Sequence, residues 1–158
     1  MAGSDKKGVA TEGKLEVLDL TEANFVAGGG DYYDKSFTEK GSPADATVGS
    51  YCFAGTILKE VKLPNSVTKI KDSAFEKCAA LTSVTFSKDV TEVGASAFSG
   101  CTSLKSFEFP KVKIVSAYVL SGCTALTKVV IPETVTDLKG NIFKNCSALT
   151  EIHIAAVN

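Results

Sequence analysis

The stretch from Ala74 to Ser96, AFEKCAALTSVTFSKDVTEVGAS, contains a pattern that recurs along the chain. It can be written A-F-x-x-C-x-x-L-x-x-V-x-F, and later copies open at residues 97, 119 and 142. The leucines that begin the strand segments recur at intervals of 23, 23, 22 and 23 residues, at Leu58, Leu81, Leu104, Leu126 and Leu149. Self-similarity at a fixed period of roughly 20–50 residues is typical of a solenoid.

Each copy contains a short segment with the alternation of a β-strand. In LTSVTF, residues 81–86, Val84 and Phe86 alternate with Ser83 and Thr85, as expected when one face of a strand is buried. A proline follows three of these segments and ends the strand, because it has no N–H to donate to a sheet. A second short β segment comes next, and the A-F-x-x-C piece predicts one helical turn at a corner.

The sequence therefore predicts a β-dominated solenoid of about six rungs of ~23 residues, with a parallel sheet on one face and short helical turns at the corners. Stacked rungs share a core that no single rung could bury alone. The central inward residues of the sheet are predicted to be Leu18, Val61, Val84, Phe107, Val129 and Ile152. We expect Phe75, Phe98 and Phe143 to be fully buried and stacked in the core.

The 158 residues are enough for one domain, which we place at residues 14–158. Its first strand is LEVLDL, residues 15–20. Residues 24–47 exceed the repeat and contain turn-forming GGG and GSP runs, so we predict a loop inserted between the first two rungs. Residues 1–13 are polar and contain glycine, and we interpret them as a disordered lead or an expression remnant.

The composition excludes several classes of function. Seventeen basic and eighteen acidic residues give a net charge of −1, which argues against nucleic-acid binding because phosphate contacts need a concentrated basic surface. No apolar run approaches the ~20 residues of a membrane span. The start of the chain carries no basic and apolar signal sequence, although a cleaved signal would leave no trace.

The repeat resembles the BspA-like, or treponemal-type, leucine-rich repeats. Residues 58–78, LKEVKLPNSVTKIKDSAFEKC, are close to that family's idealised unit, and the resemblance covers residues 15–154. Three departures are a missing cysteine near Thr56, a copy shortened at Val112, and Leu120 in place of phenylalanine. The resemblance implies a leucine-rich-repeat solenoid in a cell-surface or secreted bacterial protein that binds other proteins or attaches cells to hosts.

The cysteines favour a structural role. No C-x-x-C motif or Cys/His cluster is present, which argues against zinc, and five cysteines are an odd number for a disulfide framework. We expect Cys78, Cys101, Cys123 and Cys146 to form a buried column of reduced thiols that act as small hydrophobes, one in each rung. The alternative is one strained disulfide between neighbouring rungs.

Catalysis is not expected. The one histidine, His153, lies at an outward strand position with no nucleophile beside it, and no P-loop, G-x-S-x-G or H-E-x-x-H motif is present. The sequence predicts no enzyme activity, no cofactor and no metal site. We interpret His153 as a solvated side chain on a terminal strand.

Binding is expected on outward strand positions and on the inserted loop, because solenoids bind through extended side-chain arrays. The strand positions are small and mixed in charge, so they form either a weak polar binding face or a solvated one. Tyr32 and Tyr33 are aromatic candidates on the loop, unless the loop is a lid over the first rungs. The candidate partner-binding residues are Tyr32, Tyr33, Glu60, Lys62, Ser83, Thr85, Glu108, Lys128 and His153.

Two functions remain open at this point. One is a protein-binding adhesion module whose partner is a host extracellular-matrix or surface protein. The other is a structural spacer without a ligand of its own. We expect a monomer that binds no nucleic acid and has no membrane span in this chain.

Overall fold

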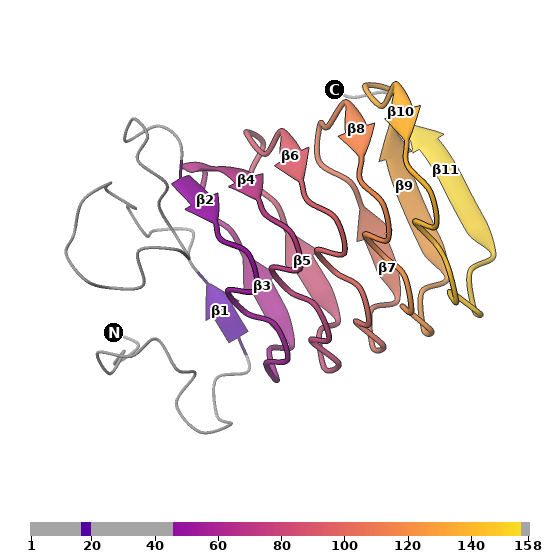
Figure 1. Cartoon of the computed structure of the whole chain (residues 1–158), viewed down its shortest axis with the longest axis horizontal. Helices are drawn as coiled ribbons and strands as arrows, with labels where there is room; N and C mark the ends of the chain where they lie inside the picture. Colours follow the sequence, from indigo (N-terminus) through magenta and orange to yellow (C-terminus); the bar gives the residue numbers. More distant parts are fainter. Residues whose placement is uncertain (1–16, 20–45, 156–158) are drawn as a thin grey trace.

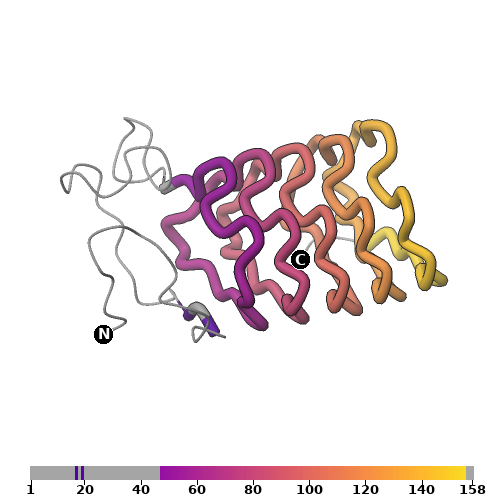
Figure 2. The backbone as a smooth tube through the Cα atoms, turned by 60° about the horizontal axis from the view of Figure 1, so that its bottom comes forward, coloured from indigo at the N-terminus to yellow at the C-terminus, as the bar shows by residue number. Residues whose placement is uncertain are grey.

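The computed structural model describes residues 17–19 and 46–155, which form a parallel β-solenoid (Figure 1). The strands in this part of the chain are β1 (Val17–Asp19), β2 (Ala46–Val48), β3 (Glu60–Lys62), β4 (Val67–Ile70), β5 (Ser83–Thr85), β6 (Glu92–Val93), β7 (Ser106–Glu108), β8 (Ile114–Val115), β9 (Lys128–Pro132), β10 (Asp137–Leu138) and β11 (Glu151–Ala155). The backbone winds through successive rungs that stack along the long axis of the molecule (Figure 2). The expected solenoid with a period of ~23 residues is confirmed.

The described residues do not include every predicted segment. The expected lead at residues 1–13 and residues 24–45 of the expected loop, with Tyr32 and Tyr33, lie outside them. The last two residues of the expected loop, at 46 and 47, belong to β2.

The odd-numbered strands form the main face, and all their pairings are parallel. Leu18 is opposite Val61, which is opposite Val84, so the predicted central residues are in register across β1, β3 and β5. The second half repeats this arrangement in β7, β9 and β11, with Phe107, Val129 and Ile152 in register. The sequence predicted one sheet, whereas the strands pair as two three-stranded sheets that meet between β5 and β7.

The even-numbered strands form a second face with the same division. Strands β2, β4 and β6 pair in one sheet, and β8 and β10 pair in another. The division lies between the same two rungs as on the main face. It coincides with two changes in sequence: the rung that contains β7 is one residue shorter after Pro110, and Phe107 replaces the valine found at the equivalent position of β3, β5 and β9.

The third side of each rung is a run of hydrogen-bonded turns, with no helix in the described residues. In the rung that contains Phe75, the N–H of Cys78 donates to the carbonyl of Phe75 at 3.3 Å, and the N–H of Leu81 donates to that of Cys78 at 3.0 Å. The corner expected as one helical turn is therefore a series of tight turns. We call this side the turn edge.

The core is built around stacked phenylalanines. The rings of Phe53, Phe75 and Phe98 stack in sequence at centroid distances of 5.1 Å, and both Phe75 and Phe98 are fully buried. Phe107 continues the cluster 5.1 Å from Phe98. The expectation for Phe143 is wrong: Leu120 occupies the equivalent position in the rung between it and Phe98, and Phe143 is only partly buried.

The last described rung is open on its outer side. Ile152 and Ile154 were expected to point inward, but their side chains are 52% and 78% exposed. They pair in register with the buried Val129 and Ile131 of β9, and no rung within residues 17–19 and 46–155 covers them. The alternation of the strand is therefore as predicted, whereas burial requires a neighbour on both sides.

The cysteines form a column of thiols that also donate hydrogen bonds. Each sulfur lies near a carbonyl of the preceding rung, and the distances are 3.0 Å for Cys78, 3.3 Å for Cys101, 3.2 Å for Cys123 and 3.1 Å for Cys146. All five cysteines, including Cys52, are free thiols. Three of the column are fully buried, but Cys146 is only partly buried, which corrects the expectation that all four are inside.

Thr56 takes the place of the missing cysteine. Its N–H donates to the Phe53 carbonyl at 3.2 Å, as the cysteine N–H does in later rungs. Its hydroxyl lies 3.4 Å from the Cys78 sulfur and extends the column by one rung. Burial raises the pKa of the Cys101 thiol well above its ordinary value, and it raises that of Cys123 to about 12. These thiols are therefore held in the neutral form that donates a hydrogen bond.

Candidate binding surfaces

The candidate strand residues lie in two outward columns on the main face, which we call the strand face. Parallel pairing places equivalent side chains of adjacent rungs next to each other. The first column contains Glu60, Ser83, Ser106, Lys128 and Glu151, and the second contains Lys62, Thr85, Glu108, Val130 and His153. The structure therefore brings all seven candidates on strands to one face, with the gap between β5 and β7 in the middle.

The strand face is polar and its charges are mixed. Lys62 donates to Asp19 at 3.0 Å, and this hydrogen bond raises the pKa of the Lys62 ammonium above its ordinary value. At the other end, the Glu151 carboxylate lies 3.1 Å from the His153 ring and 4.0 Å from the Lys128 ammonium. These pairs are exposed, so each contributes little to stability, and the face has no single dominant charge.

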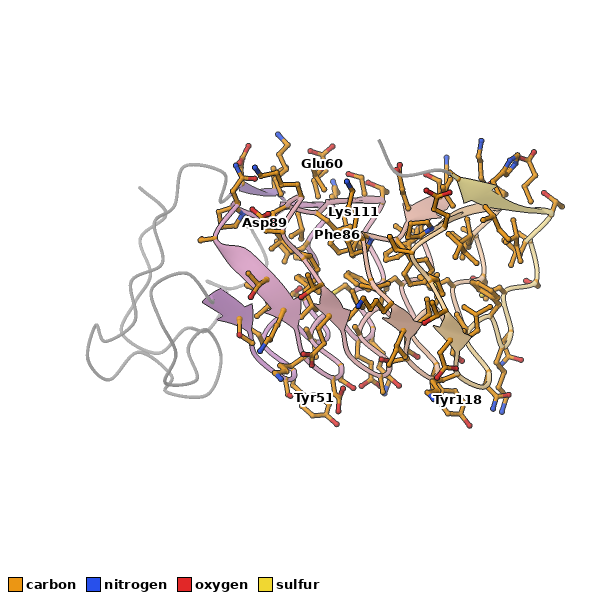
Figure 3. All side chains as sticks on the ribbon, turned by 90° about the horizontal axis from the view of Figure 1, so that it is seen from above. Tyr51, Glu60, Phe86, Asp89, Lys111 and Tyr118 are labelled. Atoms are coloured by element: carbon orange, nitrogen blue, oxygen red, sulfur yellow. The ribbon has the colours of Figure 1, made fainter. Side chains whose placement is uncertain are left out.

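The sequence analysis overlooked two tyrosines on the turn edge. Tyr51 and Tyr118 both occupy the position just before the A-F pair of the repeat, where other rungs have serine or asparagine. Their side chains are 64% and 40% exposed. Figure 3 shows both on the opposite side of the molecule from Glu60. Their signal in the sequence was the departure of one repeat position from small polar residues.

In residues 17–19 and 46–155, no three His, Cys, Asp or Glu side chains are grouped as a metal site would require. The same part of the chain contains no helix with the length and apolar character needed to cross a bilayer.

A family model and several solved structures match the chain. The model, described as BspA type leucine rich repeat region, matches residues 46–158 with 6 copies. A leucine rich cell surface protein from Faecalibacterium prausnitzii is similar, with 33% identity and a TM-score of 0.65, over 79% of this chain and 33% of that one. A leucine-rich repeat protein from Eubacterium ventriosum has 34% identity and a TM-score of 0.64, over 70% of this chain and 30% of that one.

The T. pallidum leucine rich repeat protein is similar over 73% of this chain and 54% of its own, with 29% identity and a TM-score of 0.65. The chain thus spans between 30% and 54% of the length of these three proteins. A comparison with curated proteins finds no match.

Proposed function

Because the chain belongs to the BspA-type leucine-rich-repeat family, we propose that it is a non-catalytic protein-binding module of a bacterial surface or secreted protein. The observation that carries the proposal is the alignment of outward side chains in two columns along the strand face. A host extracellular-matrix or surface protein is the proposed partner, and adhesion is the proposed role. The likeness to a protein described as a cell surface protein supports a location outside the cell.

A paired sheet holds the columns rigidly, so a partner does not have to order flexible loops on binding. Rigid presentation lowers the entropic cost of association. The mixed charges, such as Lys62 beside Asp19 and Lys128 beside Glu151, suit a partner surface of mixed polarity. Because the columns contain no tryptophan, tyrosine or arginine, we propose a modest affinity for this face.

The second candidate function is a structural spacer. It is favoured by the small, polar side chains of the strand face, which water can solvate without any partner. If the chain binds a protein, Tyr32 and Tyr33 remain proposed contributors to that binding, although they lie outside the described residues.

We also propose that the chain is a monomer.

Binding to a panel of purified host extracellular-matrix and surface proteins separates the two functions. The test variants are Lys62→Glu with Thr85→Lys on the strand face and Tyr32→Ala with Tyr33→Ala on the loop. A matched control, Lys113→Glu with Thr136→Lys, makes the same charge change on two exposed neighbours beside β8 and β10.

The protein-binding function predicts that the parent and the control bind a panel member and that the strand-face variant binds it more weakly. The melting temperatures should be nearly the same, because the changed side chains on strands are outward. If the parent binds nothing on the panel, the spacer function is favoured instead. If the strand-face variant binds as well as the parent, the contact lies on another surface.

A further inference from the structure

The last strands of the solenoid leave inward apolar side chains exposed. Strand β11 pairs with β9 on one side only and lies at the end of the array, as does β10 (Figure 1). Leu138 of β10 is 54% exposed, although its register partner Val115 is buried, and Ile152 and Ile154 of β11 are exposed in the same way. We call the outer side of β10 and β11, with these three side chains, the open end.

The edge of β11 lacks the usual protection against pairing. Exposed edge strands are commonly kept short or interrupted by lysine, proline or a bulge, because their backbone groups are a template for another strand. The sequence of β11, EIHIA, contains neither lysine nor proline, and its register with β9 runs through five residue pairs without a shift. This edge therefore has the composition of a strand that is paired on both sides.

The backbone of β11 also offers a donor to an added strand. In earlier rungs, the Leu63 N–H donates to the Thr85 carbonyl of the following rung at 3.0 Å, and the Phe109 N–H donates to the Val130 carbonyl at 3.0 Å. The strand register places Ile154 at the equivalent position. Among residues 17–19 and 46–155 no further rung follows it, so its N–H is directed toward the open side.

The pairing of β9 with β11 shows which side chains suit this edge. Val129 lies opposite Ile152, and Ile131 lies opposite Ile154. The Lys128 ammonium lies 4.0 Å from the carboxylate of the first β11 residue. Because parallel strands repeat one register from rung to rung, a segment with the same order of residues can make equivalent contacts on the other side of β11.

We propose that the open end binds an extended segment of a partner protein, which adds to β11 as a parallel strand. The segment has a basic residue followed by apolar residues one and three positions later, as in the β9 sequence KVVI. In strand addition, main-chain hydrogen bonds supply affinity and alternate side chains supply specificity. This inference goes beyond the proposed function, because it uses the inward side chains of the open end and not the outward columns of the strand face.

A labelled peptide tests the proposal. The probe is ALTKVVIPE, the sequence of residues 125–133, which contains the strand that already pairs with β11. The control peptide carries Val129→Thr with Ile131→Thr. Threonine keeps the length, the charge and the β-branched preference for strands but removes the apolar contacts.

Two matched variants of the protein locate the contact. Ile154→Lys places on the β11 edge the residue that natural edge strands use to prevent pairing. Ile114→Lys makes the same change at an exposed isoleucine of β8, which is not at the open end. Both side chains are largely in solvent, so both variants should melt near the parent temperature.

Fluorescence anisotropy should show that the probe binds the parent and Ile114→Lys. We expect binding about tenfold weaker or worse for Ile154→Lys with the probe, and for the parent with the control peptide. The strand-face variant, Lys62→Glu with Thr85→Lys, should bind the probe as the parent does. Equal binding of both peptides, or no binding of the probe, overturns the proposal and leaves the strand-face function to its own test.

Hydrogen exchange identifies the strand to which the probe adds. The Ile154 amide should exchange more slowly when the probe is bound, because its N–H gains an acceptor. Protection at the facing edges of β5 and β7 instead would place the peptide at the sheet interruption and contradict the proposal. Light scattering of the parent alone gives the remaining outcome: self-association that Ile154→Lys abolishes would make a second copy the occupant and overturn the proposal.

Discussion

Phe98 lies at the centre of the aromatic core. Its ring contacts Phe75, Phe86 and Phe107 at centroid distances of 5.1, 5.8 and 5.1 Å. Phe98 is fully buried in the middle of the array, whereas Phe143 is partly buried beside the open rung. The same residue type at equivalent repeat positions therefore has two different environments.

Replacement of Phe98 with alanine should lower the free energy of unfolding by roughly 3–5 kcal/mol, because it leaves a cavity between aromatic neighbours. Phe143→Ala should cost less, since part of that ring is already in contact with water. Urea titrations of both variants measure the difference. Equal losses in the free energy of unfolding would mean that the place of a ring in the stack does not influence stability.

The thiols should differ in reactivity according to burial. The thiolate is the reactive form, and burial raises the pKa of all four column thiols. Cys78, Cys101 and Cys123 are in addition fully buried, so these three should resist a thiol reagent until the protein unfolds. Cys52 and Cys146 are only partly buried and should be labelled first in native buffer. Mass spectrometry of labelled peptides gives the order, and early labelling of Cys101 would contradict the buried column.

Among the elements, the junction between β5 and β7 is distinctive. Both sheets are interrupted there, while the turn edge remains hydrogen-bonded: the Phe98 N–H donates to the Val119 carbonyl at 3.0 Å. The packing of Phe86 against Phe107, with ring centroids 5.4 Å apart, also links the two rungs. The solenoid is therefore joined at this point by backbone hydrogen bonds on the turn edge, by the Ser116 hydroxyl, which donates to the Val93 carbonyl at 2.7 Å, and by its core.

Hydrogen exchange should reveal this difference between elements. Amides that cross the junction on the turn edge, those of Ser96 and Phe98, should be protected to the level of the core. Amides in β5 and β7 should exchange faster on average than those of β9, which is paired on both sides. Residue-resolved exchange by NMR makes the comparison. Uniform protection across β5, β7 and β9 would show that the sheet interruption has no energetic consequence.

At the scale of the whole molecule, charge is nearly balanced. Seventeen basic and eighteen acidic residues give a net charge of −1, and the strand face carries charges of both signs. Long-range steering of a partner requires a concentrated field of one sign. The chain instead presents polar columns on one side and tyrosines on the other.

The association rate with any protein partner should therefore depend only weakly on ionic strength. Steered associations fall steeply as salt is added, whereas those without steering change little. Surface plasmon resonance at low and physiological salt measures the rate directly, with Lys62→Glu as a variant that shifts the net charge. A steep decrease for the parent chain would indicate a charged patch that dominates the encounter.

The sequence by itself determined the solenoid, its period and the register of its strands. Each rung repeats the same alternation, so the position of Val61 next to Val84 follows from pattern alone. It also determined the column of cysteines, because a residue that recurs once per period must occupy the equivalent position in every rung. These features depend on the local pattern and on the nearest-neighbour rungs, both of which can be recognised in the repeat.

Only the tertiary structure decided how far each repeated residue is buried and where the ladders break. Ile152 follows the inward pattern but is exposed, because burial depends on a rung on each side. The interruption beside Phe107 lies between two rungs of unequal length, and how such rungs pair is not specified by either rung alone. The exposure of Tyr51 and Tyr118 likewise depends on the packing around a left-handed turn position, since Ser73 at the equivalent position is buried, and residue periodicity does not encode that packing.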